Sequence, residues 1–560
     1  MFDWVHPSFV LILGALLIPA FAGRWRQAYL LLLPAAALAV TLSVPHGTFG
    51  TFQVLGMDLT VGRVDALSLV FAYVFGVMLV IGTIYALHLE EALQHVAAFI
   101  YAGSALGVVF AGDLITLYVF WEAMAFSSVL LIWCRRDPAS WGAGWRYVLV
   151  HAAGGVVLLA GIVLYYNETN SIQFGATQNV GPAFYLILIG FMINAAVPPL
   201  HAWLTDAYPE ATVTGAIFLS ALTTKTAVYT LIRGYPGTEM LVWFGAVMAI
   251  YGVVYAVLAN DIRRLLAYHI ISQVGYMVAG VGMGTAIALN GSASHAFTHI
   301  LYKGLLFMGA GAVIHMTGRS KLTELGGLYR WMPITFLLYM VGAFSISAFP
   351  LFSGFVSKTM VVEAAAVDGR AGIWLMLSLA SAGTFLHTGL KLPYFTFMGK
   401  DSGLRPREAP LNMLVAMGLA AFLCVFIGVY PDWLYALMPT EVHYQAYTAG
   451  HVLWELQLLL FTGVGFFVLL KHVGGESKIS IDTDWIYRRP LPALVRLLIS
   501  AARSMQTMVS ARALRHMEQF LNRVFHFHGP DSILARSWST GTTVLWVVLL
   551  LMLYLLFYYF

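Results

Sequence analysis

The residues that point most directly to chemistry are ionisable side chains inside apolar segments. The stretch "SHAFTHILYKGLLF" spaces His295, His299 and Lys303 four residues apart, which places them on one face of a helix. A charged group at bilayer depth costs at least about 2.5 kcal/mol, so each one marks a candidate site. Three titratable groups on one face predict a water-lined proton relay. The spacing also suits a metal pair, but no third ligand or carboxylate lies nearby in sequence, so we predict no metal site.

Three further ionisable residues lie within or directly beside apolar segments. Glu122 lies in "YVFWEAMAF", too far from either flanking loop for its short side chain to reach water. Lys225 lies near the middle of "SALTTKTAVYTLIR", and Lys358 ends "FPLFSGFVSK". With the histidine–lysine face, they form the predicted proton relay.

Two apolar segments are interrupted by proline. "GFMINAAVPPLHAWL" contains Pro198 and Pro199, and a second long segment contains Pro350. Proline removes a backbone donor, and the freed groups must face protein or water because lipid offers no partner. Paired interruptions in corresponding halves are the sequence sign of an inverted-repeat transporter. The polar residues of the first interruption and two separate histidines are weaker candidates for the polar axis: Asn194, His201, His269 and His151.

These residue types can move protons without a cofactor. Burial favours the neutral amine of a lysine, and a nearby carboxylate restores the ammonium form. Moving a partner charge therefore switches the proton affinity of the lysine. We predict that the chain itself holds no cofactor.

The elements that must position these residues are membrane helices. The 560 residues are 60% hydrophobic and only 10% charged, with a mean hydropathy of +0.81, whereas soluble domains carry about 25% charged residues. Two cysteines, Cys134 and Cys424, give no disulfide framework. The net charge of +4 is spread over the loops, and we expect no cleavable signal peptide. Sixteen spans are predicted, at about 8–23, 28–44, 64–86, 92–112, 114–134, 142–166, 183–205, 211–233, 240–258, 265–289, 293–317, 331–366, 372–398, 409–430, 450–470 and 540–560.

Basic residues mark alternate loops and so predict the orientation. The basic loops contain Arg24 and Arg26, Arg135 and Arg136, Arg263 and Arg264, Arg319 to Arg330, and Lys400 to Arg407. The loops around 45–63, 167–182 and 431–449 are poor in lysine and arginine. With sixteen spans, both termini are expected on the non-cytoplasmic side of the cytoplasmic (inner) membrane.

Residues 484–527 are too basic to cross lipid. From Leu494 to Val524, apolar residues recur at steps of three and four, which predicts one amphipathic helix of roughly 50 Å lying along a surface. Two interpretations remain open: an anchor in the lipid interface, or a brace across the protein's own spans or a neighbouring subunit. The second is favoured because a final span, 540–560, fixes its far end.

Several ordered motifs resemble those of one family, the antiporter-like subunits shared by Mrp-type cation/proton antiporters (the D-type above all) and complex I (the L, M and N types). They are "VDALSLVF", "YVFWEAM", "PPLHAWLTDAYPEA", "KTAVYTLIR", "DIRRLLAYHIISQVGYM", "HAFTHILYKGLLFMGAGAVIH", "GGLYRWMP" and "FPLFSGFVSK". The resemblance covers roughly residues 60–430, and the C-terminal tail resembles the L-type tail in kind.

The resemblance implies an all-α membrane protein with two inverted five-helix repeats, each with a broken helix, plus a lateral amphipathic helix. The implied segments are helices 1–3 (1–90), a first half (91–235), a second half (236–400), helices 14–15 (401–475), the lateral helix (476–535) and a final span (536–560). Glu122 matches the family's first-half glutamate, Lys225 its bridging lysine, and Lys358 the residue from which protons exit. Asp65, Asp261 and Arg263 lie in family motifs with structural roles.

One departure concerns the first broken helix, where the family carries a lysine and this chain carries Asn194. An amide does not titrate at physiological pH. Either Lys225 takes over the pairing with Glu122, or the first half-channel is altered or silent.

We therefore expect an ion- and proton-translocating subunit of an Mrp-like monovalent cation/proton antiporter complex. Its expected partners are homologous antiporter-like subunits, small helical subunits, the lipid bilayer, protons and Na⁺ or K⁺, with no nucleic acid. The alternative is a proton-pumping subunit of a complex I-like NADH:quinone oxidoreductase or membrane-bound hydrogenase, in which any redox centre belongs to partners. A scaffold that no longer conducts, or a role in inorganic-carbon uptake, is a third reading.

Overall fold

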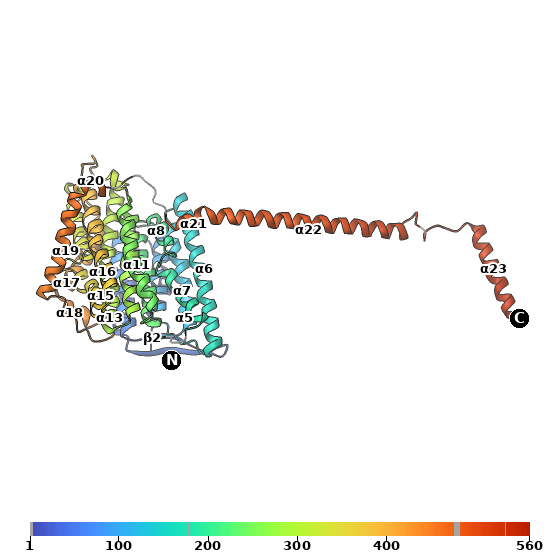
Figure 1. Ribbon diagram of the computed structural model, residues 1–560, viewed down its shortest axis with the longest axis horizontal. Coiled ribbons are helices and arrows are strands. Elements are labelled where there is room, and N and C mark those ends of the chain that lie inside the picture. The colour runs from blue at the N-terminus through green and yellow to red at the C-terminus, as the bar shows by residue number, and fades with distance from the viewer. Residues whose placement is uncertain (1–3, 177–179, 475, 477–481, 533) are drawn as a thin grey trace. The chain divides into compact units, whose positions relative to one another are not determined.

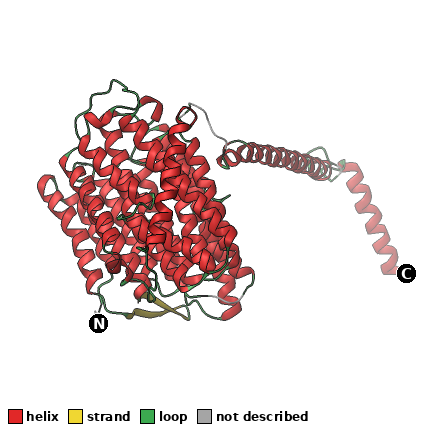
Figure 2. Cartoon of the chain, turned by 60° about the vertical axis from the view of Figure 1, so that its left-hand side comes forward, coloured by secondary structure: helices red, strands yellow, loops and turns green. Residues whose placement is uncertain are grey.

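Apolar segments in lipid must satisfy their backbone groups internally, which favours helices, and helices dominate this chain (Figures 1 and 2). The computed structural model describes residues 4–176, 180–474, 476, 482–532 and 534–560. Parts of the predicted 167–182 loop and of the predicted 476–535 segment therefore lie outside the described residues. The chain divides into two units, Met1–Asp484 and Trp485–Phe560.

The N-terminal part contains three helices and one hairpin. They are α1 (Pro7–Leu17, extended by a 3₁₀ turn at Ile18–Ala20), α2 (Gly23–Ser43), β1 (Gly47–Val54), β2 (Met57–Val64) and α3 (Ala66–Ala86). The antiparallel hairpin pairs Gly47 with Val64 and Val54 with Met57, in a segment that the sequence analysis described only as a loop. Leu55 and Gly56 both have positive φ, as a tight two-residue hairpin turn requires.

The first half follows. Its elements are α4 (Ala92–Phe110), α5 (Leu114–Trp133), α6 (Pro138–Thr169), α7 (Pro182–Asn194), α8 (Ala202–Ala207, then a 3₁₀ turn at Tyr208–Glu210), α9 (Gly215–Ala221) and α10 (Thr223–Gly234). The predicted 211–233 span is thus interrupted at Leu222, between α9 and α10, which the sequence analysis did not anticipate.

The second half repeats this order of elements. Its elements are α11 (Glu239–Leu258), α12 (Ile262–Met283), α13 (Ala286–Thr317), 3₁₀ turns at Leu322–Glu324 and Leu328–Arg330, α14 (Pro333–Ile346), α15 (Ser353–Val367) and α16 (Ala371–Thr384), which continues as π-helix at Phe385–Lys391 and Tyr394–Met398. The first unit ends with α17 (Leu411–Val429), α18 (Pro431–Tyr435), α19 (Ala449–Val468) and α20 (Leu470–Val473).

The sixteen predicted spans correspond to these helices. Thirteen described helices have the length and apolarity to cross a membrane, and three shorter apolar helices lie at Pro7–Ala20, Pro182–Asn194 and Pro333–Ile346. The last two are the first parts of the broken spans. The prediction of an all-α membrane fold is confirmed.

The two breaks have the same backbone conformation. Ala196 and Ala348 each lie two residues beyond the end of the preceding helix, with φ of 57° and 59°. Pro198 and Pro350 each follow two residues later. A left-handed alanine costs about 1 kcal/mol or more, so its occurrence at the same position of both breaks identifies them as copies of one element.

Backbone hydrogen bonds repeat as well. The N–H of Val197 donates to the carbonyl of Met192, and the N–H of Phe349 to that of Phe344, each at 3.1 Å. Both bonds span five residues and follow a left-handed residue, which is the Schellman pattern that ends a helix. The prolines therefore do not act alone, because a specific turn ends each first half-helix.

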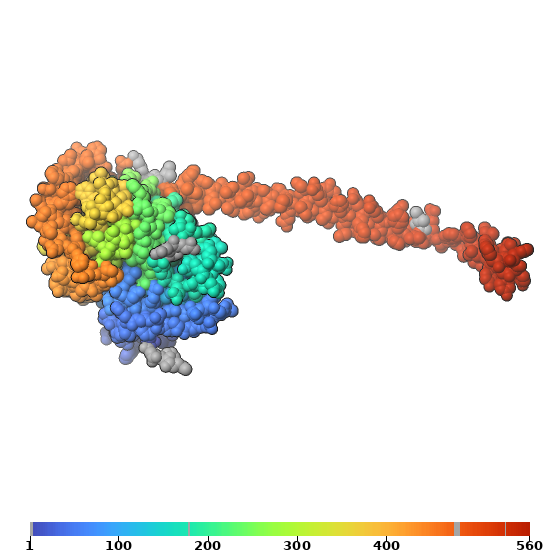
Figure 3. Space-filling view, turned by 60° about the horizontal axis from the view of Figure 1, so that its bottom comes forward, coloured from blue at the N-terminus to red at the C-terminus, as the bar shows by residue number. Residues whose placement is uncertain are grey.

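Seen from the end at which the hairpin lies, segments from the early, middle and late parts of the first unit lie next to one another (Figure 3). The hairpin contacts this surface through a polar network, described below. Inside the first unit, buried apolar residues form one large core and a second, smaller core between α11, α12, α13, α15 and α16.

The C-terminal helices are α21 (Asp484–Arg488), α22 (Pro490–His528) and α23 (Thr540–Tyr559). The predicted amphipathic helix is therefore one uninterrupted helix of 39 residues, about 58 Å long at 1.5 Å per residue. None of its described side chains is buried within this chain. The choice between lipid anchor and brace stays a prediction.

Candidate functional site

In the first half, Glu122 of α5 lies against the backbone of α6. A Cβ atom added at Gly155 would lie 1.9 Å from Glu122 Oε1, so this glycine provides the space for the carboxylate. Oε1 is buried, and among the described residues it has no hydrogen-bond partner. Glu122 is half-buried, and one oxygen of its carboxylate therefore lacks a direct partner, as expected of a group that exchanges protons through water.

Lys225 is fully buried where α9 and α10 meet. Its Nζ donates to the carbonyl of Ser220 at 2.6 Å and to Thr224 Oγ1 at 3.2 Å. Among the described residues it forms no ion pair, so the structure gives no direct Lys225–Glu122 pair to replace the family's lysine. The interruption at Leu222 frees the carbonyl that binds the ammonium, and so explains why the span is broken here.

The weaker candidates of the first half lie around its break. Asn194 is the last residue of α7 and is buried. His151 of α6 packs between the rings of Tyr147 and Trp203, with centroids 4.1 and 4.5 Å away. His201 is fully buried, and its Nε2 lies 3.1 Å from Oδ1 of Asp482, a residue that the sequence analysis missed.

In the second half, the predicted histidine–lysine face is fully buried. Lys303 Nζ lies 3.1 Å from Nδ1 of His269, and His269 Nε2 lies 3.2 Å from Thr384 Oγ1. The Thr384 hydroxyl donates to the carbonyl of Ala380, so it accepts from Nε2–H of His269. In the neutral ring Nδ1 then accepts from Lys303. His269, a weaker candidate from sequence, is therefore the residue that directly contacts the central lysine.

The other end of this face leads toward the second break. The rings of His295 and His299 are 6.0 Å apart, and His295 Nδ1 lies 3.5 Å from Ser357 Oγ. The next residue, Lys358, donates to the freed carbonyl of Ile346 at 3.3 Å. Lys358 thus binds a backbone group that the break makes available.

Two ionisable residues of the π-helical stretch extend the chain of groups beyond His269. The ring of His387 lies 4.8 Å from that of His269. Lys391 donates to the carbonyls of Ala259, at 3.1 Å, and Val257, at the C-terminal end of α11. "TFLHTGLKL" places them four residues apart within a predicted span, so the rule that identified Lys303 would also have found them.

Past Lys358, buried groups reach an open cavity. Glu455 of α19 is 5% exposed, and its Oε2 has no hydrogen-bond partner among the described residues. One turn earlier, His451 Nδ1 lies 3.4 Å from the hydroxyl of Tyr444, which lies 2.9 Å from Thr359 Oγ1. Tyr444 lines a cavity of about 720 Å³, together with Asp432, Tyr435, Glu441 and His443.

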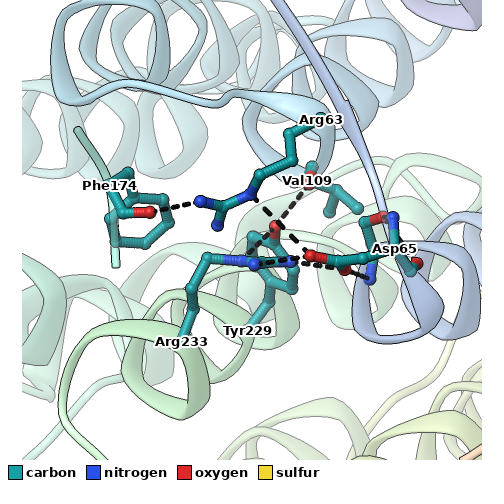
Figure 4. A network of polar contacts seen from close by, with 7 residues as sticks. Arg63, Asp65, Val109, Phe174, Tyr229 and Arg233 are labelled. Atoms are coloured by element: carbon teal, nitrogen blue, oxygen red, sulfur yellow. Dashed lines mark hydrogen bonds and ion pairs between the residues drawn. The ribbon is translucent and has the colours of Figure 1, made fainter. Parts of the chain in front are cut away.

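The family motif residue Asp65 belongs to a separate network, between β2, α3 and α10 (Figure 4). Arg233 pairs with Asp65 through two bonds of 2.7 and 2.8 Å and donates to Tyr229. Asp65 also caps α3. Arg63 donates to the carbonyl of Phe174, and Tyr229 to that of Val109. These bonds hold the hairpin on the helices, which is a structural role.

Comparisons with known proteins identify what the chain is similar to. Residues 111–386 match the family described as "NADH:quinone oxidoreductase/Mrp antiporter, TM". The chain is 32% identical over 433 residues to the A-type component of the Na(+)/H(+) antiporter of Alkalihalophilus pseudofirmus, covering 68% of this chain and 53% of that protein. It is 29% identical over 425 residues to "Hydrogenase-4 component B" of Escherichia coli, covering 67% and 63%. The chain thus spans less than two thirds of either relative.

Among solved structures, a chain of the membrane-bound sulfane sulfur reductase, an archaeal respiratory membrane complex, matches with a TM-score of 0.72 and 22% identity. The match covers 98% of this chain and 99% of that one. At this identity the likeness establishes the fold.

Proposed function

Residues 111–386 belong to the membrane-subunit family shared by NADH:quinone oxidoreductases and Mrp antiporters, and from this premise we propose that the chain translocates protons as one subunit of an Mrp-like monovalent cation/proton antiporter complex. The relay would consist of Glu122, Lys225, His295, His299, Lys303 and Lys358. His269, His387, Lys391 and Glu455 extend it in the second half.

The observation that carries the proposal is the continuity of buried titratable groups in the second half. They run from Lys391, beside the end of α11, through His387 and His269 to Lys303. Beyond the histidine–lysine face, His295 contacts Ser357, and Thr359 contacts Tyr444 at the open cavity. Ser357 and Thr359 are the two sequence neighbours of Lys358. Burying each group is costly, and a fold that buries so many in one line supports a route for protons.

The setting of the complex is part of the proposal. The named relatives are components of an antiporter and of a hydrogenase, which supports partner subunits within the membrane. We place the basic loops on the cytoplasmic side of the inner membrane and both termini on the other side. Lys391 would then take up protons near the cytoplasm, and the cavity beside Tyr444 would release them outside. The exchanged cation would be Na⁺ or K⁺.

A second candidate is a proton pump that a redox module drives. The hydrogenase-4 relative favours it. In this case the partners would carry the electron-transfer centres, and the same relay would respond to them. The two candidates differ in what drives proton movement, so one preparation tests both.

The test uses the complex purified with its native partners and placed in vesicles that contain a pH-sensitive dye. Proton movement driven by a Na⁺ or K⁺ gradient, with no electron donor, supports the antiporter. Movement that needs an electron donor supports the redox candidate. Absence of proton movement under both conditions would refute the proposed function.

Two variants and one control locate the route. Lys303→Ala and Lys358→Ala should each reduce proton movement by on the order of a hundredfold, as expected for loss of a positioned proton-transfer group. Lys321→Ala removes an exposed lysine of a loop and should leave the rate unchanged. Wild-type rates in both test variants would exclude the relay.

Asn194→Lys restores the residue that the family carries on the first broken helix. If the first half is only weakened by the asparagine, this change should increase the number of protons moved per cation. An unchanged ratio would indicate that the first half does not depend on this position.

A further inference from the structure

The connection between α20 and α21 inserts one carboxylate into the first unit. The side chain of Asp482 is 3% exposed. It accepts hydrogen bonds from His201 at 3.1 Å, from the hydroxyl of Tyr268 at 2.6 Å and from the hydroxyl of Tyr251. Asp482 lies outside the family-matched range 111–386, so nothing in the family motifs points to it.

These donors come from both halves of the fold. His201 immediately precedes α8, at the end of the first break, whereas Tyr251 and Tyr268 lie on α11 and α12. The carboxylate therefore lies at the junction of the two halves, in contact with the break. Burial alone would raise the pKa of Asp482, but the bonds from His201, Tyr251 and Tyr268 lower it, so the side chain is ionised at neutral pH.

The pairing fixes the chemistry of His201. Because a carboxylate accepts and does not donate, Nε2 carries the hydrogen and Nδ1 holds the lone pair in the neutral ring. Nδ1 is buried and has no hydrogen-bond partner among the described residues. It can therefore bind and release one proton while Nε2–H stays bonded to Asp482.

Several other polar side chains surround His201 at the first break. Asp206 of α8 is paired with Arg146 of α6, and Asn194 does not titrate. Tyr255 stacks on Tyr251 and Tyr268, and the charge of Arg264 on α12 acts on Tyr268. Of these groups, His201 is the one that combines a buried open nitrogen with a carboxylate partner.

We propose that His201 carries protons at the first broken helix and that Asp482, supplied by the C-terminal connection, is its positioning residue. This pair would take the place of the lysine that Asn194 replaces. The inference rests on the proposed function and assigns a proton-carrying residue to the first half.

The test measures the pH profile of proton movement in the vesicles described above. Asp482→Asn keeps an acceptor for Nε2–H but removes the charge. Proton movement should fall by about tenfold or more, and its dependence on pH should differ from that of the wild type. Asp482→Glu should restore most of the rate and of the wild-type pH dependence.

A matched variant separates proton handling from docking. Tyr251→Phe combined with Tyr268→Phe removes two bonds that hold the connection but leaves the Asp482–His201 pair. It should keep the wild-type pH profile. If it reproduces the lower rate and the altered pH dependence of Asp482→Asn, the role of Asp482 is structural and the inference is overturned.

The remaining outcomes are distinct. Normal rate and profile in Asp482→Asn, with an active wild type, would overturn this inference alone. A wild-type complex that moves no protons would refute the proposed function, and the inference with it. Rates are compared per assembled complex, so a variant that assembles less is still informative.

Discussion

Gly155→Ala tests the role of Glu122 without changing an ionisable residue. The added Cβ would lie 1.9 Å from Glu122 Oε1, whereas ordinary contact begins at 3.4 Å. The carboxylate must therefore retreat by about 1.5 Å. Because it is the far end of a flexible side chain, it can do so at about 0.5–1.5 kcal/mol.

The same change should hardly affect stability. Replacing glycine by alanine inside a helix stabilises it by about 1 kcal/mol, which offsets the cost of moving the carboxylate. A misplacement of about 1 Å can reduce a proton-transfer rate by about a hundredfold, equivalent to about 2.7 kcal/mol in the barrier. We thus expect an unchanged unfolding temperature with strongly reduced proton movement.

The assay is proton movement in vesicles alongside thermal unfolding of the complex. Gly142→Ala is the matched control, because it lies on the same helix and its Cβ would meet only the end of Arg146, at 3.2 Å. Glu122→Gln should reduce proton movement as much, and adding Gly155→Ala to it should have no further effect. A wild-type rate of proton movement in Gly155→Ala would refute the role of Glu122 in proton transfer.

Three further outcomes are expected. Lys391→Arg keeps the positive charge and the hydrogen bonds to α11, but arginine does not deprotonate. Proton movement should therefore fall by about tenfold or more, with unchanged assembly of the complex. A normal rate would show that Lys391 only caps the end of α11. Glu455→Gln should reduce proton movement similarly, whereas Glu363→Gln, at an exposed position of α15, should not. Burial alone would raise the pKa of Asp65, but Arg233 lowers it, so their pair stabilises the hairpin above about pH 3.9 and is lost in more acidic solution. Asp65→Asn should lose about 1–2 kcal/mol at neutral pH, seen as faster hydrogen exchange in β1 and β2.

The sequence predicted the membrane fold because lipid leaves the backbone few choices. Helix is the form that satisfies an isolated apolar segment, so spans could be read one at a time, and Pro198 and Pro350 located the breaks. The hairpin of β1 and β2 was missed because β1 is exposed along almost its whole length, so no alternation of buried and exposed residues marks it. The interruption at Leu222 was missed because no proline or glycine marks it.

The relay was predictable only as a set of residues. Any ionisable group in an apolar span is a candidate, and this rule found Glu122 and Lys303. Applied consistently, it would also have found His387, Lys391 and Glu455. The order of contacts, with His269 beside Lys303, was not predictable because these residues come from different helices.

The sequence by itself thus determined which segments are helical, where two of them break, and which buried residues can carry charge, since these depend on local composition. Only the tertiary structure decided the partners. It placed Glu122 against Gly155, gave Lys225 backbone carbonyls in place of a carboxylate, and brought Asp482 to His201 across 281 residues of chain. Such contacts depend on how helices pack, and neither periodicity nor hydropathy specifies which side chain meets which.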